Sequence, residues 1–409
     1  MNRRIRSRAT PRARRVALLA GVLLIQAATA PPAGSADRPG LDTREVVHAG
    51  QHGYHTYRIP AAVRTGKGTV LLFLEGRKHS SSDFGETHML VLRSADGGDT
   101  WGAPRVVHKE DTPGAEITIG NPCPVYDATA GRVWLVFTRD NQQVLVTASD
   151  DDGRTWPKPR GITADVRPEH WTRYWTGPGH GIQLSRGPRA GRLLFPSYHL
   201  QRDGSEITMR SHAIYSDDHG RTWQVGRGTT RGDSIDKVVF KAGWIPQGFV
   251  WAGCECLAAE LSDGRLYLAV RNQVRFRDRK AYTTSNDGGD SWSPLALHDE
   301  VPGLKCMSGL ARGDSPGDVG HPDGASGDRL LLSCITSCDR GDRRDLAVFA
   351  SRDGGRTWPV SKLVHKGPAA YSDLCVLPDG TVLCFFEGGA KHCYESIRLA
   401  RFHAGWPEE

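Results

Sequence analysis

Several widespread catalytic motifs are absent from this 409-residue chain. It contains no Walker phosphate-binding loop, no Rossmann glycine fingerprint, no His-Glu-x-x-His zinc motif and no Gly-x-Ser-x-Gly nucleophile elbow. Enzyme classes that depend on these motifs are therefore disfavoured. A convincing long amphipathic helix is also lacking, whereas glycine (48 residues) and proline (24 residues) are abundant. This composition favours many turns and few long helices.

Acidic residues are missing from the first thirty positions, which hold seven arginines. These seven charges equal the formal net charge of +7 of the whole chain, so the remainder sums to zero. A strongly basic chain suggests nucleic acid as a partner, but here the excess is confined to the start. We therefore expect no nucleic-acid partner for the folded part.

A long hydrophobic run is lacking after residue 30, where no stretch approaches the roughly 18 apolar residues of a membrane span. Before it, the arginines are followed by an apolar run over 16–25 and a small-x-small sequence over 28–30, a pattern typical of a secretory signal peptide. The alternative, a membrane anchor, is disfavoured because the apolar run is short. We expect a signal peptide over residues 1–30 (cleavage as late as 36), a linker over 31–44, and a secreted protein without a stable membrane anchor.

Metal-binding spacings are also lacking among the nine cysteines. Cys254-x-Cys256 and Cys334-x3-Cys338 fit paired zinc-finger spacings poorly. Buried thiols or disulfides are the favoured interpretation, and the odd count leaves at least one cysteine outside any disulfide within the chain. We predict no metal site and no required cofactor.

One eight-residue pattern, Ser-x-Asp-x-Gly-x-Thr/Ser-Trp, occurs five times. The copies are Ser94–Trp101, Ser149–Trp156, Ser216–Trp223, Ser285–Trp292 and Ser351–Trp358. Each copy, called an Asp box below, is typical of a tight hairpin turn. The Asp accepts backbone N–H bonds two residues on, the Gly tolerates a positive φ, and the Trp plugs the turn. Five copies of one pattern, spaced along the whole chain after residue 90, indicate a repeat fold.

A short alternating run precedes each Asp box and is predicted to be a strand. The five runs are Met89–Arg93, Val144–Thr147, His212–Tyr215, Ala281–Thr284 and Leu346–Phe349. Strand–turn–strand units repeated every ~65 residues fit four-stranded propeller blades, of which the ~375 residues after the signal would form about six. We predict an all-β, six-bladed propeller over 45–409 with four antiparallel strands per blade; an array of β-sandwiches is the alternative. The Asp boxes should lie at peripheral turns, away from the active site.

The residues between the boxes resemble a known family. Tyr57-Arg-Ile-Pro60, the five boxes, Gly177-Pro-Gly-His-Gly-Ile-Gln183 and Ala370-Tyr-Ser-Asp373 together resemble the sialidases (neuraminidases), in particular the secreted bacterial type. The resemblance extends over residues ~45–405 and implies one site at the propeller axis that releases terminal sialic acid with retention. The chain departs from the family pattern beside the base-acting Glu255, where Cys254 precedes it and Leu257 stands in place of a usual glutamine.

By resemblance, three arginines bind the carboxylate of sialic acid, to which a guanidinium can donate two hydrogen bonds while staying charged. These are Arg58, Arg271 and Arg343, the last with Arg340 and Arg344 as neighbouring candidates. Glu387 is expected to offset the charge of Arg58. Arg77 is a candidate for contact with the 4-position of the sugar, and Asn121 for another polar contact.

The resemblance also assigns the chemistry. Tyr371 is the expected nucleophile, because a neutral phenol can approach a carbon that already carries a carboxylate. Glu255 would take its proton. Asp83, favoured over Glu86, would protonate the leaving oxygen and then activate water. Trp171, Tyr174 and Trp175 either line a pocket for the N-acyl group or pack a blade, with packing slightly favoured.

The sequence leaves alternatives to a retaining exo-α-sialidase that acts on sialylated glycoproteins, glycolipids and oligosaccharides. One is a non-catalytic lectin, which could keep the arginines but has no need of the nucleophile, base and acid together. Others are a trans-sialidase and a hydrolase of deaminated sialic acid. We expect sialylated glycans as partners and a monomeric protein.

Overall fold

Strands dominate the part of the chain that the structure describes, as predicted. The computed structural model describes residues 40–111, 114–233, 235–237, 239–242, 245–273, 278–313, 328–339 and 341–409. Within them, the helices are α1 (Thr163–Val166) and the 3₁₀ turns η1 (Gln51–Gly53), η2 (Gly187–Arg189) and η3 (Trp406–Glu408). The expected signal peptide over 1–30 lies outside the described residues. No helix in the described part of the chain has the length and apolar character needed to cross a membrane.

Three sheets have four strands each, hydrogen-bonded in chain order. The first comprises β2 (Thr56–Arg64), β3 (Val70–Arg77), β4 (Thr87–Ser94) and β5 (Arg105–His108). The second comprises β6 (Ile119–Asp127), β7 (Arg132–Arg139), β8 (Gln143–Ser149) and β9 (Arg160–Gly161). The third comprises β17 (Cys256–Glu260), β18 (Leu266–Val270), β19 (Arg279–Ser285) and β20 (Ala296–Pro302).

Two further sheets have seven strands each. One comprises β10 (Trp171–Thr176), β11 (Ile182–Gln183), β12 (Leu193–Asp203), β13 (Glu206–Ser216), β14 (Gln224–Val225), β15 (Val239–Ala242) and β16 (Ile245–Ala252). The other comprises β21 (Gly309–Arg312), β22 (Leu330–Asp339), β23 (Asp342–Ser351), β24 (Val360–Val376), β25 (Thr381–Gly388), β26 (Ser396–His403) and β1 (Asp42–His48). Strand β1 begins three residues before the expected domain boundary at 45 and pairs with β26.

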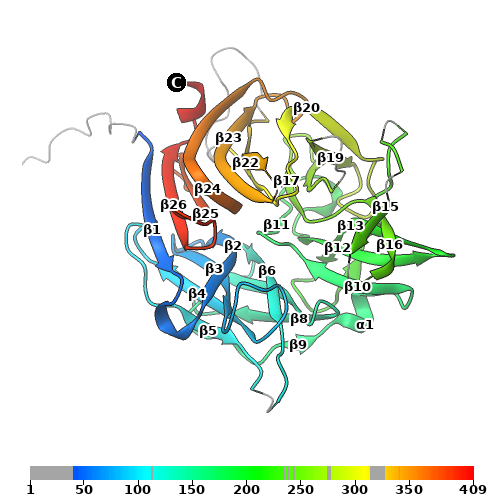
Figure 1. The fold of residues 1–409 in the computed structure, drawn as a ribbon, viewed down its shortest axis with the longest axis horizontal. Coiled ribbons are helices and arrows are strands. Elements are labelled where there is room, and N and C mark those ends of the chain that lie inside the picture. Colours follow the sequence, from blue (N-terminus) through cyan, green and yellow to red (C-terminus); the bar gives the residue numbers. More distant parts are fainter. Residues whose placement is uncertain are drawn as a thin grey trace, which may run out of the picture. The chain divides into compact units, whose positions relative to one another are not determined.

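The arrangement of these sheets is propeller-like. Figure 1 shows them around a common centre, with β2, β6, β11 and β17 nearest to it. The count differs from the predicted six blades of four strands, because the described residues form five separate sheets and two of these have seven strands. The all-β, propeller-like character is nevertheless the predicted one.

All five Asp boxes form turns at the end of a strand, as predicted. In the first, Gly98 N donates to Ser94 Oγ (2.7 Å) and Thr100 N donates to Asp96 Oδ1 (3.0 Å). The Asp carboxylate therefore accepts the N–H of the residue four positions later, and not two positions later as expected. Equivalent bonds recur in the other four boxes, and the box glycines have φ between 77° and 92°.

The tryptophans of the boxes pack against neighbouring sheets. Trp101, at the end of the first sheet, meets Phe385 of β25 edge to face, with ring centroids 5.5 Å apart. Trp156, at the end of the second sheet, meets Phe73 of β3 in the same way at 5.5 Å. Burial of such large rings between sheets stabilises the ring of sheets. The boxes are thus structural.

Irregular backbone interrupts three inner strands, β2, β6 and β24. The pairing register shifts beside Ile59 between β2 and β3, beside Asn121 between β6 and β7, and beside Tyr371 between β24 and β25. Ile59 (φ 61°) and Asn121 (φ 59°) also adopt left-handed backbone, which costs energy for a β-branched residue such as isoleucine. Bulges of this kind re-aim side chains and occur next to active sites.

Candidate active site

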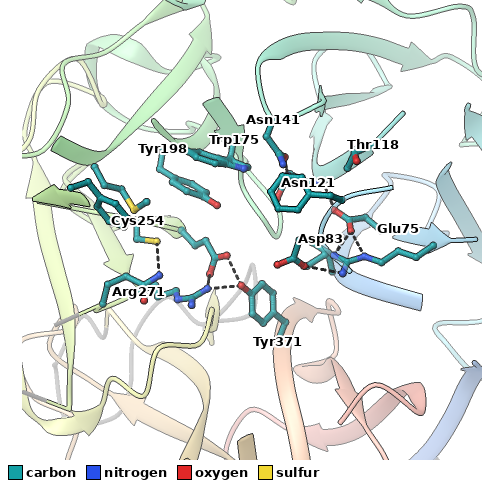
Figure 2. A pocket seen from close by; sticks show the side chains of 17 residues that line it. Glu75, Asp83, Thr118, Asn121, Asn141, Trp175, Tyr198, Cys254, Arg271 and Tyr371 are labelled. Carbon is teal, nitrogen blue, oxygen red and sulfur yellow. Dashed lines mark hydrogen bonds and ion pairs between the residues drawn. The ribbon is translucent and has the colours of Figure 1, made fainter. Parts of the chain in front are cut away.

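A cavity of about 300 Å³ is lined by the irregular residues of all three strands, Ile59, Asn121 and Tyr371. Its lining contains acidic, basic and aromatic side chains contributed by separate sheets (Figure 2). The residues are Ile59, Glu75, Arg77, Asp83, Phe84, Thr118, Asn121, Asn141, Trp175, Tyr198, Met209, Phe249, Cys254, Glu255, Arg271, Gln273 and Tyr371. No Asp-box residue is among them, in agreement with a peripheral role for the boxes.

Tyr371, Glu255 and Arg271 form one hydrogen-bonded group. Figure 2 shows Tyr371 and Arg271 of this group in its lower half, joined by a dashed line. The hydroxyl of Tyr371 donates to Glu255 Oε1 in a short hydrogen bond. Arg271 Nη1 donates to the same hydroxyl (2.6 Å) and to Glu255 Oε2 (2.7 Å). A nucleophile-type hydroxyl thus lies in direct contact with a carboxylate that can accept its proton.

Burial raises the pKa of the Tyr371 phenol well above its ordinary value, although Arg271 and Arg343 act in the opposite direction. The phenol is therefore protonated at neutral pH. It requires a base to become a nucleophile, and Glu255 lies in position to be that base.

Arg58 forms an ion pair with the fully buried carboxylate of Glu387. Its Nε donates to Glu387 Oε1 (2.6 Å), and the side chains are 4% and 0% exposed. The same carboxylate accepts the N–H of Ile59 (2.9 Å) and, through Oε2, the N–H of Tyr371 (3.2 Å). Glu387 therefore binds the irregular backbone of two strands as well as offsetting the charge of Arg58.

The three predicted arginines converge on one ring. The guanidinium carbons of Arg58, Arg271 and Arg343 lie 5.3, 5.9 and 5.3 Å from the centroid of Tyr371. Like charges this close repel one another unless anions offset them. A further anion, such as a ligand carboxylate, would be stabilised among these three cations.

Arg343 is distinguished from its neighbouring candidates by its contacts. Its Nη2 donates to the carbonyl of Lys305 (2.9 Å), and its Nη1 lies 3.4 Å from the hydroxyl of Tyr394. Arg344 is instead paired with Asp342 on an exposed part of β23 (3.2 Å). Arg340 lies outside the described residues.

Arg77 connects the loop that carries Asp83 to the sheet below. Its Nη1 donates to Asp83 Oδ1 (2.8 Å) and to the carbonyl of Ser81 (2.6 Å), whereas Nη2 pairs with Glu75 Oε2 (2.7 Å). Glu75 Oε1 in turn accepts the N–H of Asn121 (2.8 Å). Arg77 lines the cavity, where it can also reach a ligand.

The favoured acid and its alternative lie in different places. Asp83 lines the cavity, with a side chain that is 73% exposed. Glu86 is bound to His79 and to His88, each at 3.1 Å, and does not line the cavity. Partial desolvation at the cavity acts to raise the pKa of Asp83, but the charges of Arg77 and Arg58 outweigh it and hold that pKa below its ordinary value. Without a ligand, Asp83 is therefore a carboxylate.

The three aromatic candidates divide into a wall residue and two packing residues. Trp175 lines the cavity and stacks on Tyr198 with the centroids 4.7 Å apart. Trp171 and Tyr174 pack instead with the buried imidazole of His212. Trp175 therefore both packs within its sheet and forms part of the cavity wall, whereas Trp171 and Tyr174 do not line the cavity.

The nine cysteines are free thiols, and all of them lie within the described residues. Cys254 lines the cavity, and burial raises its pKa to about 12.

Among the described residues, Glu86, His88 and Asp111 have ligand-type atoms within 4.8 Å of one another. None of these three lines the cavity, and His88 already bonds to Tyr54 (3.0 Å) and Glu86.

Several site residues were missed from the sequence. Glu75 is separated from Arg77 by one residue and faces the same way, because side chains alternate along a strand; that spacing could have revealed it. Tyr394, whose ring lies 3.8 Å from the Arg58 guanidinium, carries no comparable signal. Tyr198 carries no such signal either, because only folding places its ring against Trp175 in the cavity wall.

Comparisons with known proteins agree on one family. A family model described as a BNR repeat-like domain matches residues 68–384. The chain is 30% identical to a sialidase of Micromonospora viridifaciens, over 95% of this chain and 58% of that protein. It is 27% identical to sialidase-4 of Homo sapiens, over 89% of this chain and 93% of that protein. The chain thus spans less than two thirds of the Micromonospora protein.

A solved structure gives the same result. The Hadza microbial sialidase Hz136 superposes with a TM-score of 0.71 at 27% identity, covering 88% of this chain and 68% of that chain. These similarities confirm the resemblance to sialidases that the motifs predicted.

Proposed function

The chain belongs to the BNR repeat-like domain family, and from this membership and the geometry of the cavity we propose that it is a retaining exo-α-sialidase. Its substrates are terminal sialosides of glycoproteins, glycolipids and oligosaccharides. The observation that carries the proposal is the convergence of Arg58, Arg271 and Arg343 on Tyr371, whose hydroxyl donates to Glu255. Three permanently charged guanidinium groups around a phenol that is hydrogen-bonded to a carboxylate suit an anionic sugar.

Substrate binding begins at the arginines. The carboxylate of sialic acid would accept hydrogen bonds from the three guanidinium groups, which stay charged at any working pH. Glu387 holds Arg58 in place. With the carboxylate there, the anomeric carbon lies over the Tyr371 hydroxyl, and the sugar ring extends toward Asn121 and Trp175.

The reaction then proceeds in two displacements. Glu255 takes the phenol proton while the Tyr371 oxygen attacks the anomeric carbon, and Asp83 gives a proton to the departing oxygen. The products of this step are a tyrosyl-linked sugar and a free alcohol. In the second step Asp83, now a carboxylate, activates water, the Tyr371 oxygen leaves, and its proton returns from Glu255. Two inversions give net retention.

Hydrolysis of 3′-sialyllactose by the purified protein tests this proposal. We expect free sialic acid, and proton NMR at early times should detect the α anomer first because two inversions preserve the configuration. An initial β anomer would contradict the double displacement.

The same experiment separates the alternatives. Binding of sialyllactose without any release of sialic acid would favour a lectin and contradict the enzyme. Release of an internal anhydro sugar, or transfer to added lactose in place of water, would identify a trans-sialidase. Faster cleavage of substrates with deaminated sialic acid than of 3′-sialyllactose would identify a hydrolase of deaminated sialic acid.

The predicted six blades also belong to this proposal. The first half of β24 pairs with β23 through Pro368, and the second half pairs with β25 from Ala369 onward. We therefore count the sheet that contains β24 as two blades. In support, β2, β6, β11, β17, β21 and β24 contact one another in succession and close a ring of six inner strands. The predicted export, monomeric state and independence of cofactors are part of the same proposal.

Ligand binding should change the protonation of Asp83. In the free protein, its Oδ1 lies 2.8 Å from Arg77 Nη1 and 3.6 Å from Arg58 Nη1, and these cations keep its pKa low. A ligand carboxylate at Arg58 offsets that charge, so the pKa of Asp83 should rise and the acid should become protonated. We expect sialic acid to bind with uptake of a fraction of one proton at weakly acidic pH.

Calorimetry in buffers with different ionisation enthalpies measures this uptake. Asp83→Asn should bind sialic acid with no uptake, whereas Asp379→Asn, a control outside the cavity, should behave as the wild type. Equal uptake by the wild type and Asp83→Asn would contradict the assignment of the proton to Asp83.

A further inference from the structure

The loop that carries the acid also presents an aromatic side chain at the cavity rim. Phe84 follows Asp83 directly and lines the cavity, yet it is 53% exposed. The other large hydrophobic side chains that are exposed among the described residues are aliphatic: Leu41, Val106, Val239 and Leu363. Covering the exposed part of this ring with a ligand would be favourable, because it removes apolar surface from water.

Hydrogen bonds on both sides fix the backbone of Phe84. On one side, Asp83 is held by Arg77 (2.8 Å). On the other, Gly85 N donates to Thr118 Oγ1 (3.1 Å), which donates to the carbonyl of Gly85 (3.0 Å). Gly85 has φ 124°, a conformation that favours glycine. The Phe84 backbone is therefore placed by the folded loop before any ligand arrives.

The chemistry of the acid determines which part of a substrate lies there. A general acid must come within hydrogen-bond distance of the oxygen that it protonates, so the bridging oxygen of a sialoside lies beside Asp83. The sialic acid occupies the arginine pocket, and the rest of the glycan leaves that oxygen toward solvent. Its first sugar therefore passes Phe84 at the rim.

We propose that Phe84 forms a subsite for the leaving group, in which its ring packs against the apolar C–H face of a pyranose next to the sialic acid. This inference rests on the proposed sialidase function and makes Phe84 a specificity residue. Burial of the exposed half of the ring under a sugar would favour substrates with a sugar leaving group over those without one. Methyl sialosides, which have no ring at this place, gain nothing from Phe84.

Kinetics with two substrates test the subsite. Phe84→Ala should lower kcat/KM for 3′-sialyllactose by about tenfold and leave kcat/KM for methyl α-sialoside within about twofold. Phe84→Trp should restore the value for sialyllactose because it restores a flat apolar ring. Leu363→Ala, which truncates an exposed side chain far along the sequence on β24, is the matched control and should change neither value.

Three outcomes would overturn the inference. If Phe84→Ala lowered kcat/KM equally for both substrates, Phe84 would only position the Asp83 loop. If it lowered kcat/KM for neither, the ring would contribute nothing to substrate binding. A wild type that cleaves neither substrate would refute the sialidase function and the subsite with it. Saturation-transfer NMR gives a second readout: with Tyr371→Phe protein, the lactose protons of sialyllactose should receive saturation, and adding Phe84→Ala should remove it.

Discussion

Tyr371→Phe should lower kcat for sialyllactose by at least about a thousandfold, because the variant loses the oxygen that attacks the anomeric carbon. The ring and its three surrounding arginines remain, so binding of sialic acid should change little. Glu255 keeps its ion pair with Arg271 (2.7 Å) and is not left as an unpaired buried charge. The measurement is single-turnover hydrolysis together with calorimetric binding of sialic acid.

A matched control is available on another sheet. Tyr282 of β19 stacks on Tyr267 and does not line the cavity, so Tyr282→Phe should keep full activity. If Tyr371→Phe were as active as the wild type, the nucleophile would have to be another group. Loss of sialic acid binding in this variant would instead indicate that the hydroxyl serves substrate binding.

Glu387→Ala should reduce the free energy of unfolding by about 3–5 kcal/mol, which is the cost of leaving one partner of a buried ion pair alone. The variant leaves the Arg58 guanidinium, which is 4% exposed, without this carboxylate partner. It also removes the acceptor for the N–H groups of Ile59 and Tyr371. Urea unfolding followed by tryptophan fluorescence measures the loss.

Two variants calibrate this result. Glu387→Gln keeps an acceptor for the backbone and should lose less stability than Glu387→Ala. Glu45→Ala, at an exposed position of β1, should lie within about 0.5 kcal/mol of the wild type. A Glu387→Ala protein as stable as Glu45→Ala would show that the buried pair contributes nothing to folding.

The strands and turns were predictable because their causes are local. Each Asp box forms its hydrogen bonds within seven residues, from Ser94 to Thr100 in the first copy. The alternating run before each box needs only one buried face. The division into sheets was less predictable, because the length of β24 and its pairing with both β23 and β25 depend on partners on either side.

The candidate site was predictable only through resemblance. No spacing along the chain indicates that Arg58 and Glu387, which are 329 residues apart, share a hydrogen bond. The ordered motifs of a known family supplied those residues, and the folded chain brings them together. Residues outside the motifs, such as Tyr394 and Tyr198, had no such support and were missed.

The sequence by itself determined the repeat, the strand-rich fold class and the identity of the chemical groups, since these follow from local hydrogen bonding, alternation and residue type. Only the tertiary structure decided which groups meet. It placed Asp83, Phe84 and Trp175 at the cavity and Glu86 and Trp171 away from it. It also brought Arg343 close to Tyr371 and paired Arg344 with Asp342. The physical reason is that contacts between sheets depend on bulges and packing, which act over distances in space that no sequence spacing records.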